Sequence, residues 1–400
     1  MRDRRRSATG SYRRQDPWPR RARLLRRQDP CPSRHRPEGA QARPLPSSPA
    51  RPTSDAPRSR QVQASASCGL EIPLRGYSYG TPLFLPAPEI ARNQPIPDLL
   101  DKRLVIVTGK GGVGKTTVAV ALGLRAASEG KRTIVCEVSQ QENTSRMFEH
   151  TAVGFHEVEM EENLWSISID PDESMREYVL LQLKVRAMRD MLFRSRIFNY
   201  LAAATPGLKE LVTIGKIWEL AQLDRKVKKG RKYDLVIVDA PATGHGVGFL
   251  QTPRTFASIA RVGPIHSQAE TLDRFITDHE HTGTAIVALP EEMPVNESMA
   301  LERDLRDEVG VAVDRVYLNG LYPERFKKGE AEKLSQLAET ENGAARAAAR
   351  AALSEYGRAR SQRQQLARLK RGVEAPVKSL PFLFEPELDV AAARKLAGKL

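Results

Sequence analysis

Short apolar runs alternate with amphipathic stretches along the chain from about residue 95 to its end. The apolar runs are rich in Val, Ile and Leu and are bounded by polar or glycine-containing turns, a pattern typical of buried strands. They predict strands at Leu104–Thr108, Thr133–Glu137, Leu164–Ile169, Asp234–Asp239, Thr284–Leu289, Arg315–Asn319 and Pro376–Leu380. Helical spacing fills most of the gaps. Because strands and helices alternate, we expect an α/β domain over residues 96–400, built on a doubly wound, mostly parallel sheet.

The gap between the third and fourth predicted strands is longer than the others and indicates a helical insertion at about residues 171–232. Apolar residues at helical spacing predict at least two helices in it, around Met175–Tyr200 and Leu208–Leu223. The basic run Arg225–Lys232 that closes the insertion is interpreted as a solvated loop. A further Ala- and Arg-rich helix is expected at Glu341–Arg371. Its thin apolar stripe favours a solvated surface helix over a face that binds nucleic acid or membrane.

The first 95 residues differ in composition from the rest and are rich in Arg, Pro, Ser and Gln. The formal net charge of the chain is +14, and the 17 Arg and five acidic residues of the first 60 positions contribute +12 of it. Such a segment buries too little apolar surface to offset its ordering entropy, so we expect residues 1–95 to be disordered. An inert tail, a basic binding arm and a start codon assigned too far upstream are the three alternatives.

The cysteines and the apolar runs narrow the class of protein. Cys31, Cys68 and Cys136 lie far apart and form no C-x-x-C pair, so a disulfide framework or a structural zinc site is not expected. No apolar run approaches the roughly 18 residues that a membrane-spanning helix requires. We therefore expect a cytoplasmic protein without a transmembrane segment.

The stretch Leu104–Thr117 reads LVIVTGKGGVGKTT and fits the phosphate-binding loop G-x-x-x-x-G-K-[ST]. A predicted strand precedes the loop and a predicted helix follows it, which is the context that the motif requires. Its glycines let backbone N–H groups turn onto phosphate oxygens, and the helix N-terminus adds partial positive charge. Lys115 is expected to reach the β- and γ-phosphates and Thr116 to bind Mg²⁺. The expected nucleotide-binding residues are Gly109, Lys110, Gly111, Gly112, Val113, Gly114, Lys115, Thr116 and Thr117.

A second candidate site lies at Tyr233–Phe249, where an apolar run ends in Asp239. A carboxylate at the carboxyl end of a buried strand can hold Mg²⁺ and its waters beside Thr116. The segment that follows Asp239 reads Ala-Pro-Ala-Thr-Gly-His. Its last residue, His245, is either part of a switch or an ordinary loop histidine.

Two of these motifs resemble those of the signature-lysine ATPases. Lys110 gives the K-G-G-V-G-K-T form of the loop, and the segment from Asp239 to His245 resembles the D-T-A-P-T-G-H switch of the ArsA-type arsenical-pump-driving and tail-anchored-protein targeting ATPases. The resemblance implies an ATP- and Mg²⁺-dependent ATPase that works as a dimeric conformational switch for a client or partner protein. It also implies that Lys110 crosses the interface of a homodimer, or of a heterodimer with a paralogue.

Two later stretches add to the resemblance, and one earlier stretch departs from it. Asn319 looks like the family's Asn that reads the adenine edge, and Leu380–Glu387 resembles the loop that closes over the base, which places Pro381 at the nucleotide. Ser139, however, stands where the family has the Asp that orients the attacking water. We therefore expect slow hydrolysis, with Glu137 as a substitute carboxylate. The expected catalytic residues are Lys110, Lys115, Glu137 and Asp239.

Other functions stay open at this point. In the targeting ATPases a helical insertion helps to form a groove for hydrophobic client helices, and Met175, Met188 and Met191 suit either such a groove or an ordinary helix core. A positioning ATPase of the ParA and MinD type would bind DNA or membrane, but the chain ends in only a short, weak amphipathic helix. A non-hydrolytic nucleotide-binding subunit of a heterodimer is the third alternative. The widely spaced cysteines do not favour metalloid transport, which needs converging thiolates.

Overall fold

The computed structural model describes residues 98–138, 142–150, 152–182, 205–223, 225, 230–242, 245–260 and 262–400. All of them belong to the larger of the two units into which the chain divides, Pro88–Leu400. Residues 1–95, for which we predict disorder, lie outside the described part. That expectation therefore stays a prediction.

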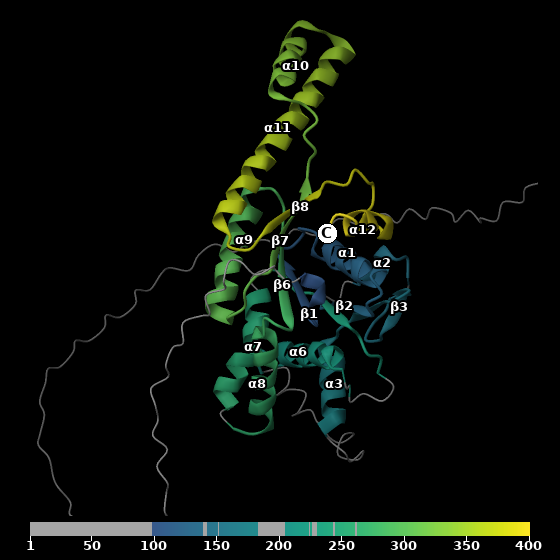
Figure 1. The fold of residues 1–400 in the computed structure, drawn as a ribbon, viewed down its shortest axis with the longest axis vertical. Coiled ribbons are helices and arrows are strands. Elements are labelled where there is room, and N and C mark those ends of the chain that lie inside the picture. The colour runs from purple at the N-terminus through teal and green to yellow at the C-terminus, as the bar shows by residue number, and fades with distance from the viewer. Residues whose placement is uncertain are drawn as a thin grey trace, which may run out of the picture. The chain divides into compact units, whose positions relative to one another are not determined.

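Within the described residues, eight strands form one sheet in the order β3-β4-β2-β5-β1-β6-β7-β8 (Figure 1). The strands are β1 Leu104–Gly109, β2 Thr133–Glu137, β3 Val158–Glu161, β4 Leu164–Ser168, β5 Leu235–Asp239, β6 Thr282–Ala288, β7 Arg315–Leu321 and β8 Val377–Pro381. Neighbours run parallel except β3 and β4, which are antiparallel. The predicted fold class is confirmed, and each of the seven predicted strands corresponds to an observed one.

Strand β3 was not predicted from the sequence. It alternates apolar and acidic side chains at the edge of the sheet, and of its residues only Met160 is buried. The other strands are recognisable as apolar runs because most of them are covered on both faces. A short edge strand needs no such run. The turn from β3 to β4 passes through Asn163, which adopts a φ of 62°, a conformation that Asn tolerates.

Helices cover both faces of the sheet, and the side chains along each strand alternate between two apolar clusters. One face, which contains Val105, packs against α1 (Lys115–Ser128), α2 (Asn143–Met147) and α12 (Val390–Ala397). The other face, which contains Leu104, packs against α6 (Leu208–Ala221), α7 (His245–Ala260), α8 (Pro264–Thr277) and α9 (Glu292–Asp304). All residues of the central strand β1 are buried, so the loop at its carboxyl end starts from a rigid support.

The helical insertion predicted for residues 171–232 is described in part. Helix α3 covers Pro171–Gln182, and α6 agrees with the second predicted helix to within two residues. Met175 is half-buried in α3, whereas Met188 and Met191 lie outside the described residues. The Tyr178 hydroxyl of α3 donates a hydrogen bond to Gln268 of α8 at 2.6 Å. The insertion therefore packs against the α7–α8 pair.

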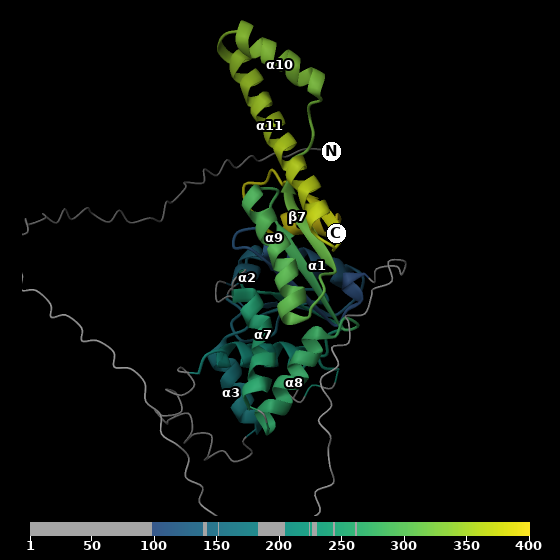
Figure 2. The ribbon, with the colours of Figure 1, turned by 90° about the vertical axis from the view of Figure 1, so that its left-hand side faces the viewer.

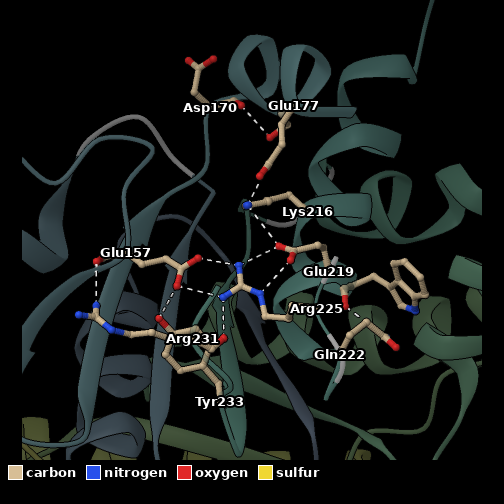
Figure 3. A network of polar contacts seen from close by, with 11 residues as sticks. Glu157, Asp170, Glu177, Lys216, Glu219, Gln222, Arg225, Arg231 and Tyr233 are labelled. Carbon is tan, nitrogen blue, oxygen red and sulfur yellow. Dashed lines mark hydrogen bonds and ion pairs between the residues drawn. The ribbon is translucent and has the colours of Figure 1, made fainter. Parts of the chain in front are cut away.

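The interpretation of Arg225 as part of a solvated loop is wrong. Its side chain is 1% exposed and lies between the carboxylates of Glu157 and Glu219, at 2.6 and 2.8 Å (Figure 3). Two partly buried carboxylates, 19% and 12% exposed, attract a guanidinium strongly enough to draw it out of water. Arg225 therefore closes the insertion through ion pairs, whereas Arg231 and Lys232, the other basic residues of the run that the structure describes, are exposed as expected.

Helices α10 (Lys328–Thr340) and α11 (Gly343–Gly372) pack against each other and project beyond the end of the sheet (Figures 1 and 2). Helix α11 corresponds to the surface helix predicted at Glu341–Arg371. Among its residues only Ala349, Ala359 and Leu369 are buried. No helix in the described part of the chain is long and apolar enough to cross a membrane.

Candidate nucleotide-binding site

Strand β1, the loop after it and helix α1 form the turn that the motif predicts, and two glycines explain its shape. Gly109 has a φ of 144°, and a Cβ there would lie 2.3 Å from the backbone oxygen of Val287 on β6. Gly114 has a φ of 91°, and a Cβ there would lie 2.4 Å from the amide nitrogen of Asn319. Glycine alone fits both positions. The first turn of α1 therefore presents its free backbone N–H groups to the loop.

Lys115 and Thr116, the first residues of α1, lie beside Asp239 at the end of β5. Thr116 Oγ1 donates a hydrogen bond to Asp239 Oδ2 at 2.5 Å. Lys115 Nζ donates to the backbone oxygen of Lys110 across the loop at 3.0 Å. Strands β1 and β5 are parallel neighbours with Val107 opposite Asp239, so the two motifs meet at the same edge of the sheet. The structure thus brings together the three side chains that the motifs select.

The charges at this site are incompletely balanced. Asp239 is 5% exposed, and its second oxygen, Oδ1, is buried without a hydrogen-bond partner among the described residues. Burial raises the pKa of Asp239 to about 6, although the Thr116 hydroxyl and the Lys115 ammonium group favour the ionised form. Burial also lowers the pKa of Lys115, against the opposing effect of Asp239. A cation beside Oδ1 would complete the site.

Thr116 and Asp239 are the residues that could hold Mg²⁺. This ion prefers oxygen ligands and typically binds through one or two protein groups together with nucleotide phosphates and water. A buried carboxylate oxygen without a described partner, next to a hydroxyl at the start of a phosphate-binding helix, fits this requirement. When bound, the ion would neutralise charge on the phosphates.

A cleft of about 710 Å³ opens over the loop, a size that suits a nucleotide. The lining residues that the motifs predicted are Gly111, Gly112, Gly114, Lys115, Thr116, Thr117 and Asp239. Those that the sequence analysis missed are Asn143, Arg146, Met147, Glu149, Leu388 and Asp389, whereas Glu387 ends the loop Leu380–Glu387 that was expected to close over the base. The acidic Glu-Pro-Glu run after the last strand was a signal for the second part of this set. The residues of helix α2 carried no such signal in the sequence, because a five-residue helix is too short to show helical periodicity.

The sequence model of the anion-transporting ATPase family matches residues 102–272 and 257–344, which together make up more than half of the chain. The chain belongs to the anion-transporting ATPase family. The match begins just before β1 and includes the phosphate-binding loop, Asp239 and Asn319. The predicted resemblance to ArsA-type ATPases is thereby confirmed.

Individual relatives agree with the family assignment. The ATPase BagA of Mycobacterium tuberculosis is 29% identical over 244 residues, which cover 58% of this chain and 69% of that protein. A Halobacterium salinarum protein whose name describes an arsenical pump-driving ATPase is 28% identical over 243 residues, or 56% of this chain and 36% of that protein. The ATPase GET3 of Podospora anserina is 27% identical over 177 residues, or 44% of this chain and 50% of that protein.

Lys110, which gives the loop the signature form of the family, forms an ion pair with Glu297 on α9. The distance from Nζ to Oε1 is 2.6 Å, and Nζ also lies 3.0 Å from the sulfur of Met293. The Lys110 and Glu297 side chains are 35% and 37% exposed, and Met293 is 62% exposed. The signature lysine therefore lies at the surface of the protein, on the rim of the site.

The two residues expected at the adenine differ in their placement. Asn319 on β7 lies against the loop, where its Nδ2 donates a hydrogen bond to the backbone oxygen of Val113 at 3.0 Å. Pro381 ends β8 and is exposed. Neither residue lines the described cleft, which the loop after β8 reaches through Glu387–Asp389. The loop that the family places over the base therefore does contribute to the cleft, but with residues further along than Pro381.

Glu137, expected as a substitute for the family's switch Asp, is 1% exposed at the end of β2. Its two carboxylate oxygens accept hydrogen bonds from the backbone N–H groups of Asn143 at 3.0 Å and Thr144 at 3.1 Å. In the sheet it lies directly opposite Asp239. Glu137 thus caps the start of α2, a role that the sequence analysis did not foresee.

The two switch segments are described only in part. Ser139 of the first segment and Thr243 and Gly244 of the second lie outside the described residues. His245 is the first residue of α7. The expected effect of Ser139 on hydrolysis therefore stays a prediction, and both interpretations of His245 stay open.

Proposed function

We propose that the protein binds ATP together with Mg²⁺, hydrolyses it slowly and works as a dimeric conformational switch for a client or partner protein. The observation that carries the proposal is the buried Asp239 carboxylate, which accepts a hydrogen bond from Thr116 on one oxygen and has no described partner on the other. A Mg²⁺–nucleotide complex supplies that partner. Membership of the anion-transporting ATPase family supports the same activity.

The residues of the site have separate tasks in this proposal. Backbone N–H groups at the start of α1 bind phosphate oxygens, and Lys115 exchanges the Lys110 backbone oxygen for the terminal phosphates. Thr116 and Asp239 hold the ion. Hydrolysis is slow because Ser139 replaces the family's Asp, and loss of a positioned base removes roughly 10²–10⁴-fold in rate.

Calorimetric titration tests nucleotide binding. We expect the protein to bind ATP more tightly than GTP, because the family resemblance assigns the Asn319 amide to the adenine edge, for which its Nδ2 would exchange the backbone oxygen of Val113. We also expect it to lose affinity when EDTA removes Mg²⁺. Lys115→Ala should weaken ATP binding by about 10- to 100-fold, the usual effect of a lost charged hydrogen bond. Lys131→Ala, which removes a lysine paired with Asp101, is the control. Equal affinities for ATP and GTP, or an unchanged affinity in Lys115→Ala, would refute the proposal.

Dimerisation is proposed to depend on Lys110. Its ion pair with Glu297 is partly exposed beside the exposed Met293, so the lysine can leave Glu297 for the nucleotide of a facing subunit. We expect light scattering to show a dimer of the wild type with a non-hydrolysable ATP analogue and a monomer of Lys110→Ala. A wild type that stays monomeric, alone and with a paralogue, would contradict the proposed switch.

A client surface is proposed on the helical part of the molecule. Exposed apolar residues gather there: Ile259 and Val262 at the α7–α8 corner are 70% and 82% exposed, Ile265 at the start of α8 is 50% exposed, and Leu180 of α3 is 46% exposed. Such surface suits an apolar helix. A labelled apolar peptide should bind the wild type more tightly than Ile259→Ser/Val262→Ser, and equal binding would argue against a client at this surface. The positioning-ATPase alternative gains no support from α12, which buries its apolar face at Ala392, Ala393 and Leu396.

A further inference from the structure

Helix α2 carries an arginine into the nucleotide cleft that no motif predicts. Asn143 and Arg146 both line the cleft, and residues three apart lie on the same face of a helix. The Arg146 side chain is exposed and makes no hydrogen bond or ion pair with the described residues. Nearby Glu142 is engaged elsewhere, since its carboxylate accepts a hydrogen bond from the backbone of Gly154 at 3.1 Å. A free guanidinium therefore faces the space above the phosphate-binding loop.

Two contacts fix the orientation of α2. At its start, Glu137 accepts hydrogen bonds from the backbone N–H groups of Asn143 and Thr144. Near its end, Met147 is 8% exposed and packs into the apolar cluster that contains α1. Glu137 comes directly from the sheet and is itself buried. The position of Arg146 therefore depends on a carboxylate two residues before Ser139.

The charges that line the cleft explain what Arg146 would bind. Among the lining residues that the structure describes, Glu149, Asp239, Glu387 and Asp389 carry carboxylates, and only Lys115 and Arg146 are basic. Part of the Lys115 charge is offset by the nearby Asp239. A nucleotide triphosphate adds several negative charges to this acidic cleft, so a second cation contributes strongly to its binding. A guanidinium is suited to the task, because its planar fork binds two phosphate oxygens at once.

We propose that Arg146 binds the phosphate groups of the nucleotide and that Glu137 is the positioning residue that holds Arg146 there. This inference rests on the proposed ATP binding and adds two roles to it. Glu137 then acts through α2 rather than as the base that accepts a proton from the attacking water. The proposal explains why an acidic side chain is buried at the end of β2 with both oxygens on the backbone of a five-residue helix.

Titration with ATP, ADP, AMP and adenosine tests the role of Arg146. We expect Arg146→Ala to weaken ATP binding by about 10- to 100-fold, with a smaller loss for ADP and AMP and none for adenosine. The ATP affinity of Arg146→Lys should lie between those of Arg146→Ala and the wild type, because lysine keeps the positive charge but lacks the planar fork of donors. Arg350→Ala, which removes an exposed arginine of α11, is the matched control. Unchanged ATP affinity in Arg146→Ala, or an equal loss for all four ligands, overturns the inference.

A steady-state analysis of Glu137→Gln separates positioning from base catalysis. We expect the KM of Glu137→Gln for ATP to be higher than that of the wild type and its kcat to be nearly the same. The double variant Glu137→Gln/Arg146→Ala should bind ATP no more weakly than Arg146→Ala alone. A fall in kcat at unchanged KM would assign Glu137 to base catalysis and overturn its positioning role. If the wild type binds no ATP at all, the proposed function fails first. If it binds ATP and only the variants behave otherwise, the inference alone fails.

Discussion

Two groups of buried charge in the same domain are built in opposite ways. Beside α6, Arg225 lies between Glu157 and Glu219, and Lys216 joins Glu219 to Glu177 at 3.2 and 2.7 Å (Figure 3). Arg225 and Lys216 each contact two carboxylates. In the nucleotide cleft, by contrast, one Asp239 oxygen has no described partner and Lys115 contacts a backbone oxygen.

The charges of the network stabilise the fold, whereas the charges of the cleft are arranged to bind a ligand. The network joins α3, α6 and the segment before β3, so it ties the helical insertion to the sheet. Arg225 and Tyr233 hydrogen bonds lower the pKa of Glu157 even though burial favours its neutral form. In the cleft, burial is not offset in this way and raises the pKa of Asp239. Residues of the same type thus serve stability in one region and binding in the other.

The largest expected effect comes from removing the central cation of the network. Arg225→Met removes a guanidinium that is 1% exposed and leaves Glu157 and Glu219, 19% and 12% exposed, without it. Loss of one partner from a buried ion pair costs about 3–5 kcal/mol. Urea unfolding should show this loss, while ATP affinity of the folded protein stays unchanged. Arg132→Met is the matched control, since Arg132 is 48% exposed in its pair with Asp234 and should cost less than about 1 kcal/mol. A similar loss for both variants would show that the network stabilises the fold no more than an exposed ion pair does. The two regions would then not differ in the way described.

Removal of the charge in the cleft should have the opposite effect on stability. The Asp239 pKa is raised from 3.8 to about 6 on folding, so between these pH values the folded protein binds a proton that the unfolded chain has lost. Stability contributed by this group therefore falls as pH rises through this range, by up to about 3 kcal/mol in the absence of nucleotide. Asp239→Asn lacks this loss and should be the more stable protein at pH 7.5, although it no longer binds Mg²⁺–ATP.

Unfolding of the wild type and Asp239→Asn at pH 4, 5, 6 and 7.5 measures the effect, because groups common to both proteins cancel in the difference. The wild type should lose stability relative to the variant as pH rises. A difference that stays constant over this range would show that the Asp239 pKa is not raised.

The sequence predicted those parts of the molecule whose geometry is imposed locally. Buried parallel strands must be apolar on both faces, which made most of the seven predicted strands visible as runs. The phosphate-binding loop requires Gly109 and Gly114 for steric reasons, and Asp239 ends a strand next to β1. The sequence alone was therefore sufficient to predict these residues.

Residues placed by distant contacts escaped prediction. Arg225 stands in a basic run that reads as a loop, and only the carboxylates of Glu157 and Glu219 bury it. Arg146 belongs to a helix too short to show periodicity, and Glu137 caps that helix from the end of the preceding strand, across a turn that no local pattern predicts. No pattern within a single segment reports such pairings.

A smaller effect is expected for the ion pair on the rim of the cleft. Glu297→Gln removes the partner of Lys110, and partly exposed pairs contribute about 0–1 kcal/mol. The lysine is then free for a facing nucleotide, so dimerisation with a non-hydrolysable ATP analogue should occur at up to about fivefold lower protein concentration. Light scattering over a dilution series measures this. Weaker dimerisation in Glu297→Gln would mean that Glu297 belongs to the interface itself.

The smallest expected effect concerns Asp234, immediately before the strand that Asp239 ends. Its hydrogen bond with Arg132 outweighs burial and lowers its pKa below 3.8, the reverse of the shift at Asp239. Its contribution is therefore present above about pH 4 and lost as pH falls below that value. Because its side chain is 42% exposed, Asp234→Asn should cost less than about 1 kcal/mol at pH 7 and less still at pH 3. Unfolding of the wild type and Asp234→Asn at both pH values decides the point. A cost that grows on acidification would mean that Asp234 and Asp239 respond to pH in the same direction. The contrast between balanced and unbalanced charge would then not hold for these two carboxylates.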